Sequence, residues 1–385
     1  MSAARFEFAT AHRVLFGAGV LEQAGPLAAA FGRRALVVTG RSPNRAAPLL
    51  ALLAAAGIET ALAGVPGEPT IEDARRLTRL AAGCDLVIAM GGGSALDAGK
   101  AAAALAPNTG DPLNYMEVVG PGAPMPCPPL PFIAIPTTAG AGSEATRNAV
   151  LLSPEHGVKA SLRSASMLPR IALVDPLLTL GLPPAVTAAT GMDALTQLIE
   201  PFLCARANPM TDALCRQGIA LAAGALRSAC ANGADIEARS AMSLAALLGG
   251  MALANAGLGA VHGFAAAVGG LGSAPHGAVC ARLLGPALAA NLRALRSREP
   301  ASPVIPRFAE VAALVTGQSG AAPEEAAAWT AAICEELAIP RLAAMGVPAS
   351  SADAIVPRAR AAGSMQANPI RLTDDELHSL FAAAL

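Results

Sequence analysis

Short apolar runs alternate with longer helical patterns over the first half of the chain. The runs are RALVVTG (34–40), IETALAG (58–64), CDLVIAM (84–90) and PFIAIPTT (131–138). They have the length of buried strands, and helical patterns separate them around residues 45–56 and 70–82 and from Ser94 onward. Strands joined by helices of this length form parallel units with right-handed crossovers. The pattern therefore predicts an open, parallel α/β sheet of the nucleotide-binding type.

The second half of the chain has a different pattern. From about Pro183 onward, long Ala- and Leu-rich stretches are broken by Gly and Pro, as in DALCRQGIALAAGALRSACA and ARSAMSLAALLGGMALANAG. Such stretches predict helices with no strands between them. We therefore expect an α/β domain over residues 1–182 and an all-α domain over residues 183–385, with the boundary near LPPAV.

Composition and charge narrow the classes of partner. The 385 residues exceed one typical domain, and 27 Lys and Arg against 28 Asp and Glu give a net charge of -1. This balance shows no excess of basic residues of the kind that binds nucleic acid. No uninterrupted apolar run reaches the roughly 20 residues of a membrane span. Seven widely spread cysteines without a C-x-x-C pair favour reduced thiols. We expect a cytoplasmic protein with a small-molecule partner, no nucleic acid and no membrane.

A glycine-rich turn follows the third predicted strand. In VIAMGGGSALDAGK, Gly92 and Gly93 come directly before a helix that begins at Ser94. Glycines let the backbone approach a phosphate closely, and the N-terminus of a helix attracts the negative charge. The alternative to a phosphate-binding loop is an ordinary turn between a strand and a helix. The Walker spacing fails because five residues separate Gly93 from Gly99-Lys100, and no G-x-G-x-x-G follows the first strand.

The stretch GMDALTQLIE (191–200) places a carboxylate and an amide one helical turn apart. Asp193 and Gln197 are four residues apart and would share one face of a helix, where both could bind one ligand. An Asp near a helix start more often caps the helix, however, and a single His in an apolar sequence is more often a hydrogen-bonded core residue. The residues alone therefore leave a metal site open.

A set of motifs in a fixed order resembles the iron-containing (group III) alcohol dehydrogenase family. The motifs are FGAG (16–19), GGGSALDAGK (91–100), IPTTAGAGSEAT (135–146), GMDALTQLIE (191–200), NAGLGAVHG (255–263), APHGAVCA (274–281) and ANPIRLTDDEL (367–377). The resemblance implies the dehydroquinate synthase-like fold: a Rossmann-like N-terminal domain, a helical C-terminal domain, and a nicotinamide cofactor and divalent metal in the cleft between them. It also implies a homodimer.

The resemblance assigns roles residue by residue. Gly92, Gly93, Ser94 and Asp97 correspond to the pyrophosphate loop and its helix. The residues expected to line the phosphate and ribose pocket are Thr137, Thr138 and Ser143, and Lys159 stands where the family has a lysine on the cofactor side.

The family's metal is commonly held by one Asp and three His. Asp193, His262 and His276 match three of these positions, as metal ligands and catalytic residues, while Gln197 occupies the fourth as an expected lining residue. One carboxylate and two imidazoles suit Fe²⁺ or Zn²⁺, and three protein ligands leave a position open for substrate. The missing imidazole argues for a weaker metal site or for Zn²⁺.

Two further departures concern the proton and the cofactor. Ala266 stands where the family often has a second His, so the alcohol proton must leave through water, a cofactor hydroxyl or another group. No acidic residue ends the first strand. Instead, Gly40 leaves room there, and Arg41 and Ser42 follow as possible partners of a 2′-phosphate, which favours NADP(H) over NAD(H).

The expected function is hydride transfer between nicotinamide C4 and a small alcohol or carbonyl compound polarised by the metal. Apolar residues near the proposed ligands, among them Leu258 and Phe264, favour a small or apolar aldehyde. Three alternatives stay open: a metal-free reductase resembling maleylacetate reductases, a lyase resembling dehydroquinate synthase, and a non-catalytic nucleotide-binding relative.

Overall fold

The chain folds into two compact units in a computed structural model that describes residues 5–270 and 274–385. The α/β unit comprises Thr10–Thr138 and Gly142–Leu180, and the helical unit comprises residues 5–9, Ala139–Ala141 and Gly181–Leu385. The expected domain boundary after residue 182 stays a prediction.

Six parallel strands form the sheet of the α/β unit, in the order β1-β8-β5-β4-β2-β3. Its strands and helices are β1 (Val14–Phe16), α1 (Ala24–Ala29), β2 (Arg34–Thr39), α2 (Ala47–Ala55), β3 (Glu59–Gly64), α3 (Ile71–Ala81), β4 (Leu86–Gly91), α4 (Gly93–Leu105), β5 (Phe132–Pro136), the antiparallel hairpin β6 (Asn148–Ser153) and β7 (Val158–Arg163), and β8 (Ile171–Val174). The predicted parallel sheet is confirmed. The apolar pattern missed β1, the β6–β7 hairpin and β8, which are short or half-buried.

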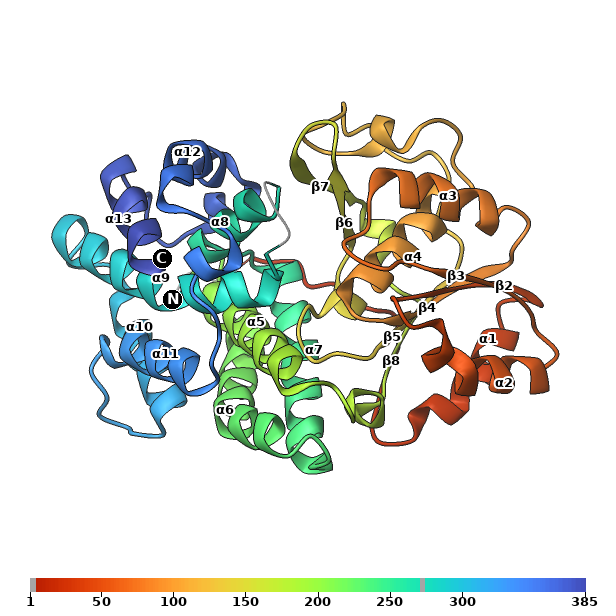
Figure 1. Cartoon of the computed structure of the whole chain (residues 1–385), viewed down its shortest axis with the longest axis horizontal. Helices are drawn as coiled ribbons and strands as arrows, with labels where there is room; N and C mark the ends of the chain where they lie inside the picture. Colours follow the sequence, from red (N-terminus) through yellow and green to blue (C-terminus); the bar gives the residue numbers. More distant parts are fainter. Residues whose placement is uncertain (1–4, 271–273) are drawn as a thin grey trace. The chain divides into compact units, whose positions relative to one another are not determined.

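Helices cover both faces of this sheet (Figure 1). Successive side chains of a strand point to opposite faces. Val37 of β2 accordingly packs with Leu49 and Leu53 of α2, whereas Leu36 and Val38 pack with α3 and α4 on the other face. The inner strands β2, β4 and β5 are therefore nearly continuous apolar runs, as expected for strands buried on both sides.

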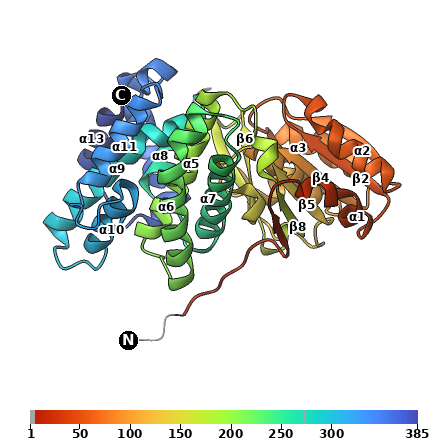
Figure 2. The same cartoon turned by 90° about the horizontal axis from the view of Figure 1, so that it is seen from below.

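The helical unit contains only helices among its described elements. They are α5 (Pro184–Leu203), α6 (Pro209–Ala231), α7 (Ile236–Asn255), α8 (Ala260–Gly269), α9 (His276–Arg298), α10 (Ile305–Thr316), α11 (Glu325–Glu336), α12 (Ala352–Ala361) and α13 (Asp374–Ala384). Helix α5 packs against α6, α7 and α9, and Figure 2 shows α5, α6 and α7 side by side. Every residue of α5 from Gly191 to Leu203 is buried, so its polar side chains need partners inside the unit.

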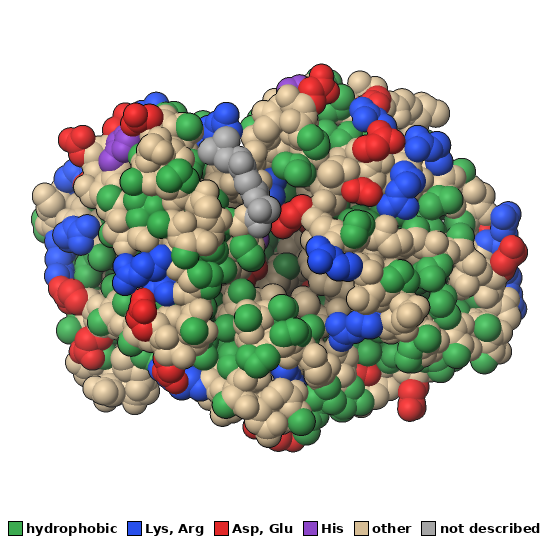
Figure 3. Space-filling view, viewed as in Figure 1, with side chains coloured by type: hydrophobic (Ala, Val, Ile, Leu, Met, Phe, Trp, Pro, Cys, Tyr) green, Lys and Arg blue, Asp and Glu red, His purple; other side chains and the backbone are tan. Residues whose placement is uncertain are grey.

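Two helices are long and apolar enough to cross a membrane by length and composition alone. They are α7 and α9, and 56% and 78% of their most apolar windows are buried inside the protein. Buried core helices of soluble proteins commonly have this length and composition, so the two helices are weak evidence for a membrane protein. On the face drawn in Figure 3, acidic and basic side chains are interspersed rather than gathered by sign.

Candidate functional site

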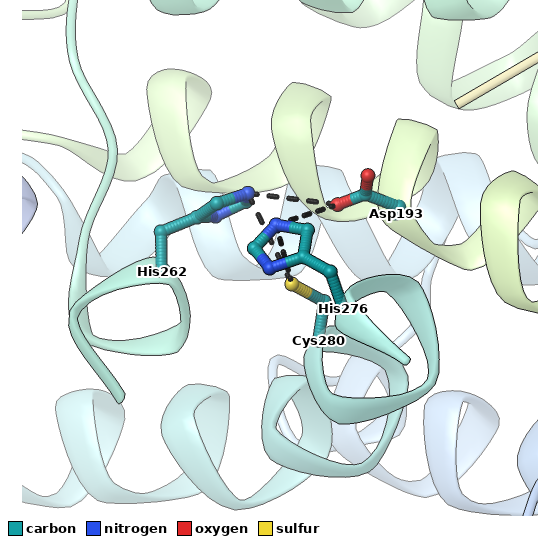
Figure 4. Close-up of side chains that lie close together, drawn as sticks. All are labelled: Asp193, His262, His276 and Cys280. Atoms are coloured by element: carbon teal, nitrogen blue, oxygen red, sulfur yellow. Dashed lines mark hydrogen bonds and ion pairs between the residues drawn. The ribbon is translucent and has the colours of Figure 1, made fainter. Parts of the chain in front are cut away.

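Three helices bring the predicted metal ligands together in the helical unit (Figure 4). Asp193 comes from the middle of α5, His262 from the first turn of α8, and His276 is the first residue of α9. Cys280, one turn further along α9, completes a group whose ligand-type atoms all lie within 4.8 Å of one another. Residues separated by more than 80 positions in the sequence thus form one cluster.

A glycine allows the first turn of α9 to reach α5. A Cβ atom on Gly277 would lie 2.3 Å from the carbonyl oxygen of Ala189, which is far inside van der Waals contact. Any larger residue would push the start of α9 away from α5. Gly277 therefore sets the approach that places His276 beside Asp193.

The spacing of the cluster resembles that of ligands around one ion. Asp193 Oδ1 lies 3.6 Å from His262 Nε2 and 3.9 Å from His276 Nε2. In a tetrahedral zinc site with bonds of about 2.0–2.3 Å, neighbouring ligand atoms are about 3.3–3.8 Å apart. Asp193 Oδ1 is buried and has no hydrogen-bond partner among the described residues. A buried carboxylate oxygen without a partner is costly, and a cation at this point would satisfy it.

The charges in the cluster depend on one another. Burial by itself would raise the pKa of Asp193, but the facing imidazoles of His262 and His276 outweigh it and hold the pKa below its ordinary value. Burial would also raise the pKa of Cys280, yet the same two imidazoles bring it below the ordinary value. The cluster therefore favours the anionic forms of both side chains, which are the forms that bind metals.

Glu200 is a functional residue that the sequence interpretation missed. Its buried carboxylate lies two turns after Asp193 on α5, and Oε2 accepts a hydrogen bond from His262 Nδ1 at 2.7 Å. Oε1 accepts another from the Val261 backbone N–H at 2.7 Å. The carboxylate thereby favours a proton on Nδ1, so a neutral His262 would offer its Nε2 lone pair to a metal. The spacing of seven residues from Asp193 on one helix was the signal available in the sequence.

Gln197 lines the cluster as expected. Its side chain is buried, its amide helps to lower the pKa of Asp193 by a hydrogen bond, and its Oε1 has no partner in the described part of the chain. Phe264 stacks on Phe381 within the helical core, with ring centroids 6.0 Å apart. Leu258 and Ala266 are both half-buried.

The predicted phosphate loop lies in the α/β unit, at the carboxyl ends of adjacent strands. Gly92 is the N-cap of α4, and a Cβ placed on it would lie 3.4 Å from Thr138 Oγ1. The Thr137 N–H donates to the Gly91 carbonyl at 2.9 Å, and Gly40 at the end of β2 also lies against Gly91. This edge of an open α/β sheet is where such folds bind ligands. The contact of these residues with a nucleotide stays a prediction.

Two predicted pocket residues are tied into a buried polar network. Asp97 accepts hydrogen bonds from Ser143 Oγ and, at 2.9 Å, from the Val150 N–H. Lys100 Nζ donates to Ser143 Oγ at 3.0 Å and lies 3.7 Å from Asp97. These bonds connect α4 to β6 and to the turn before it. A role of Asp97 and Ser143 in a cofactor pocket stays a prediction. Ser94, in the first turn of α4, is half-buried.

The remaining predicted cofactor residues lie apart from this network. Arg41 is exposed and its Nε donates to the Pro66 carbonyl at 3.0 Å, while Ser42 caps a short 3-10 helix. Lys159 lies on β7 and forms an ion pair of 3.1 Å with Glu68. Arg41 and Ser42 follow directly after the carboxyl end of β2, where an adenosine ribose would be recognised.

Comparisons with known proteins agree with the fold. Residues 11–176 match the family described as iron-containing alcohol dehydrogenase, and residues 187–385 match the Fe-containing alcohol dehydrogenase family, C-terminal. The chain is 35% identical to 1,3-propanediol dehydrogenase of Klebsiella pneumoniae over 100% of both proteins. It is also similar to the solved alcohol dehydrogenase from Oenococcus oeni, with a TM-score of 0.90, 32% identity, and coverage of 99% of this chain and 100% of that one.

A third relative was solved with a cofactor. Sulfoacetaldehyde reductase from Bifidobacterium kashiwanohense in complex with NAD⁺ matches with a TM-score of 0.85 and 27% identity, over 99% of each chain. The protein described here belongs to the iron-containing alcohol dehydrogenase family. It is an oxidoreductase that acts on CH–OH groups of small alcohols or the corresponding aldehydes, in a family that uses a divalent metal and NAD(H).

Proposed function

We propose that this enzyme interconverts a small, apolar alcohol and its aldehyde with NADP(H), and that Asp193, His262 and His276 hold a divalent metal, Fe²⁺ or Zn²⁺. The observation that carries the proposal is the buried, unpartnered Asp193 Oδ1 between two imidazole nitrogens. A group of this composition in a buried position fits a catalytic cation better than it fits a structural hydrogen-bond network.

The bound groups would supply the reactive chemistry. A divalent metal held by this cluster would supply Lewis-acid polarisation of the substrate oxygen, and a bound nicotinamide would supply the hydride donor or acceptor. Asp193, His262 and His276 would bind the metal, and Glu200 orients His262 through the bond to Nδ1. Burial of Asp193 and His262 shields these two side chains from water, which strengthens the electrostatic contact between them.

The reaction also moves one proton. Oxidation of the alcohol transfers a hydride to NADP⁺ and releases one proton to an acceptor. Ala266 offers no such acceptor on α8, so water or a cofactor hydroxyl takes this role in our proposal. A solvent-exposed acceptor should leave the rate responsive to buffer, and small imidazole bases added to the assay would reveal this.

The two ligand positions provide the first test. Asp193→Ala and His276→Ala should each abolish bound metal and turnover, because each removes one of three proposed ligands. If both variants keep metal and turnover, the proposed metal site is wrong. If both lose metal but keep turnover, the metal-free reductase resembling maleylacetate reductases is favoured instead.

The preference for NADP(H) rests on the end of β2. Gly40 carries no carboxylate to repel a 2′-phosphate, and the exposed guanidinium of Arg41 follows it. Arg41→Ala should raise the KM for NADPH by about 10-fold or more and leave the KM for NADH nearly unchanged, because a charge-assisted hydrogen bond contributes about 1.5–3 kcal/mol. Arg33→Ala, before the same strand, is the control. Equal effects on both cofactors would remove the case for NADP(H).

The lyase alternative differs in its use of the cofactor. A lyase resembling dehydroquinate synthase regenerates its nicotinamide within each turnover, so NADPH would not be consumed in net terms. Steady oxidation of NADPH in proportion to added aldehyde supports the dehydrogenase. Absence of turnover by the wild-type protein under every condition would favour a non-catalytic relative. Family membership and the intact cluster argue against that alternative.

Assembly and location are further parts of the proposal. We propose a homodimer in the cytoplasm, supported by the resemblance to soluble relatives and by the seven free cysteines. Light scattering of the purified chain would measure its mass, and a monomeric mass would contradict the proposed dimer.

A further inference from the structure

We infer that Cys280 is a fourth protein ligand of the proposed metal, so that its thiolate replaces the imidazole missing at Gln197. The inference rests on the proposed function, because it needs the metal held by Asp193, His262 and His276. It adds a sulfur ligand on this chain, and with it a preference for Zn²⁺.

The position of the sulfur atom carries the inference. Cys280 Sγ lies 3.6 Å from His276 Nε2 and 4.0 Å from His262 Nε2. The edge between sulfur and nitrogen in a tetrahedral zinc site with bonds of about 2.3 and 2.05 Å is about 3.6 Å. In Figure 4 the sulfur points toward the same two imidazole nitrogens that face Asp193. Sulfur, nitrogen and oxygen therefore surround one point.

The secondary structure fixes this arrangement. His276 and Cys280 are four residues apart on α9, so their side chains share one face of the helix. The family resemblance expects such a pair on α5, as an Asp and a His four residues later. Here α5 keeps the Asp and carries Gln197, while α9 supplies a His and Cys pair. The number of protein ligands stays at four.

Polar neighbours distinguish Cys280 from an ordinary core thiol. The side chain is fully buried, and its polar neighbours are the imidazoles of His262 and His276 and the carboxylate of Asp193. Asp193 Oδ1 is also buried and, over residues 5–270 and 274–385, has no hydrogen-bond partner. By contrast, Cys215 is fully buried in the apolar core of the helical unit. The cluster thus provides both a soft donor and an unsatisfied anion for one cation.

The chemistry of the sulfur narrows the choice of metal. On binding, the thiol loses its proton to solvent and one metal–sulfur bond forms. Thiolate is a soft ligand that favours Zn²⁺ over Fe²⁺, and zinc already stands above ferrous iron in general affinity. A thiolate also adds negative charge to the site, which neither a neutral imidazole nor the amide of Gln197 would do.

The wild-type protein offers a direct structural test. Apoprotein loaded with one equivalent of Zn²⁺ should show one sulfur neighbour at about 2.3 Å in its zinc X-ray absorption spectrum, beside nitrogen and oxygen at about 2.0–2.2 Å. A spectrum with nitrogen and oxygen neighbours alone would overturn the inference and leave the proposed metal site standing. Failure to bind zinc at all would overturn both.

Matched variants provide the second test. Cys280→Ala should remove the sulfur neighbour and weaken Zn²⁺ binding by at least about 100-fold in chelator competition, because loss of an outer-shell partner alone costs about 10- to 100-fold. Cys215→Ala, an equally buried cysteine outside the cluster, should bind zinc like the wild type. Adding Gln197→His to Cys280→Ala should recover most of the lost affinity, which a variant that merely misfolds would not do. Zinc affinity of Cys280→Ala within about threefold of the wild type would refute the inference.

Discussion

Substitution of Glu200 by Gln tests how the protein holds His262 in the form that binds a metal. The wild-type carboxylate accepts two hydrogen bonds of 2.7 Å, one from His262 Nδ1 and one from the Val261 N–H. A glutamine side chain has the same shape but offers one acceptor and one donor. One of the two contacts must therefore fail in Glu200→Gln.

The two orientations of the new amide have different signatures. If its oxygen faces Val261, its NH₂ group faces Nδ1 of His262, and the ring proton moves to Nε2, where it blocks the metal. Metal affinity should then fall by about 10- to 100-fold, which is about 1.4–2.7 kcal/mol. If the amide is reversed, the Val261 N–H loses its acceptor, and the free energy of unfolding should fall by about 1–3 kcal/mol.

Both quantities are measurable on one preparation. Chelator competition gives the zinc affinity, and urea unfolding of the apoprotein gives the stability. Glu336→Gln, an exposed acid paired with Arg227, is the matched control and should change either quantity by less than about 0.5 kcal/mol. Wild-type affinity together with wild-type stability in Glu200→Gln would refute the role given to this carboxylate.

Two further substitutions test the packing of the site and the charge of the pocket wall. Gly277→Ala should lower the free energy of unfolding by about 1–3 kcal/mol by overpacking and weaken zinc binding, because its Cβ would meet the Ala189 carbonyl at 2.3 Å. Gly320→Ala, with open space around the added atom, should be nearly neutral, and an equal loss in both would contradict this packing argument. Burial raises the pKa of Glu144 from 4.5 to about 7. The unfolded chain therefore releases this proton first as the pH rises from about 4.5 to 7, and stability falls over that window by at most about 3 kcal/mol. Glu144→Gln should lack this loss in urea unfolding at pH 5 and pH 8, and an unchanged pH dependence would count against the raised pKa.

The sequence predicted the fold wherever its patterns were long and repeated. The runs of β2, β3, β4 and β5 and the helices between them were all found. Strands β2, β4 and β5 are buried on both faces and therefore nearly continuously apolar. The shorter strands lacked such a signal. The hairpin β6–β7 is half-buried, and each of its strands spans only six residues.

The site was predictable in part. Motif order placed Asp193, His262 and His276 in one cluster, and the structure brings their side chains together. Glu200 and Cys280 lie in the same quoted motifs but were assigned no role, because the role of each depends on a contact with a residue of another helix. The contact of Glu200 with His262 spans 62 residues, and no local spacing reports a contact between α5 and α8.

The most direct test of the central claim is NADPH oxidation with a small apolar aldehyde, measured beside the metal content of the same sample. The account predicts that chelation removes both metal and turnover, and that stoichiometric Zn²⁺ or Fe²⁺ restores turnover in the wild type but not in Asp193→Ala. Full turnover by protein shown to be free of metal would contradict it.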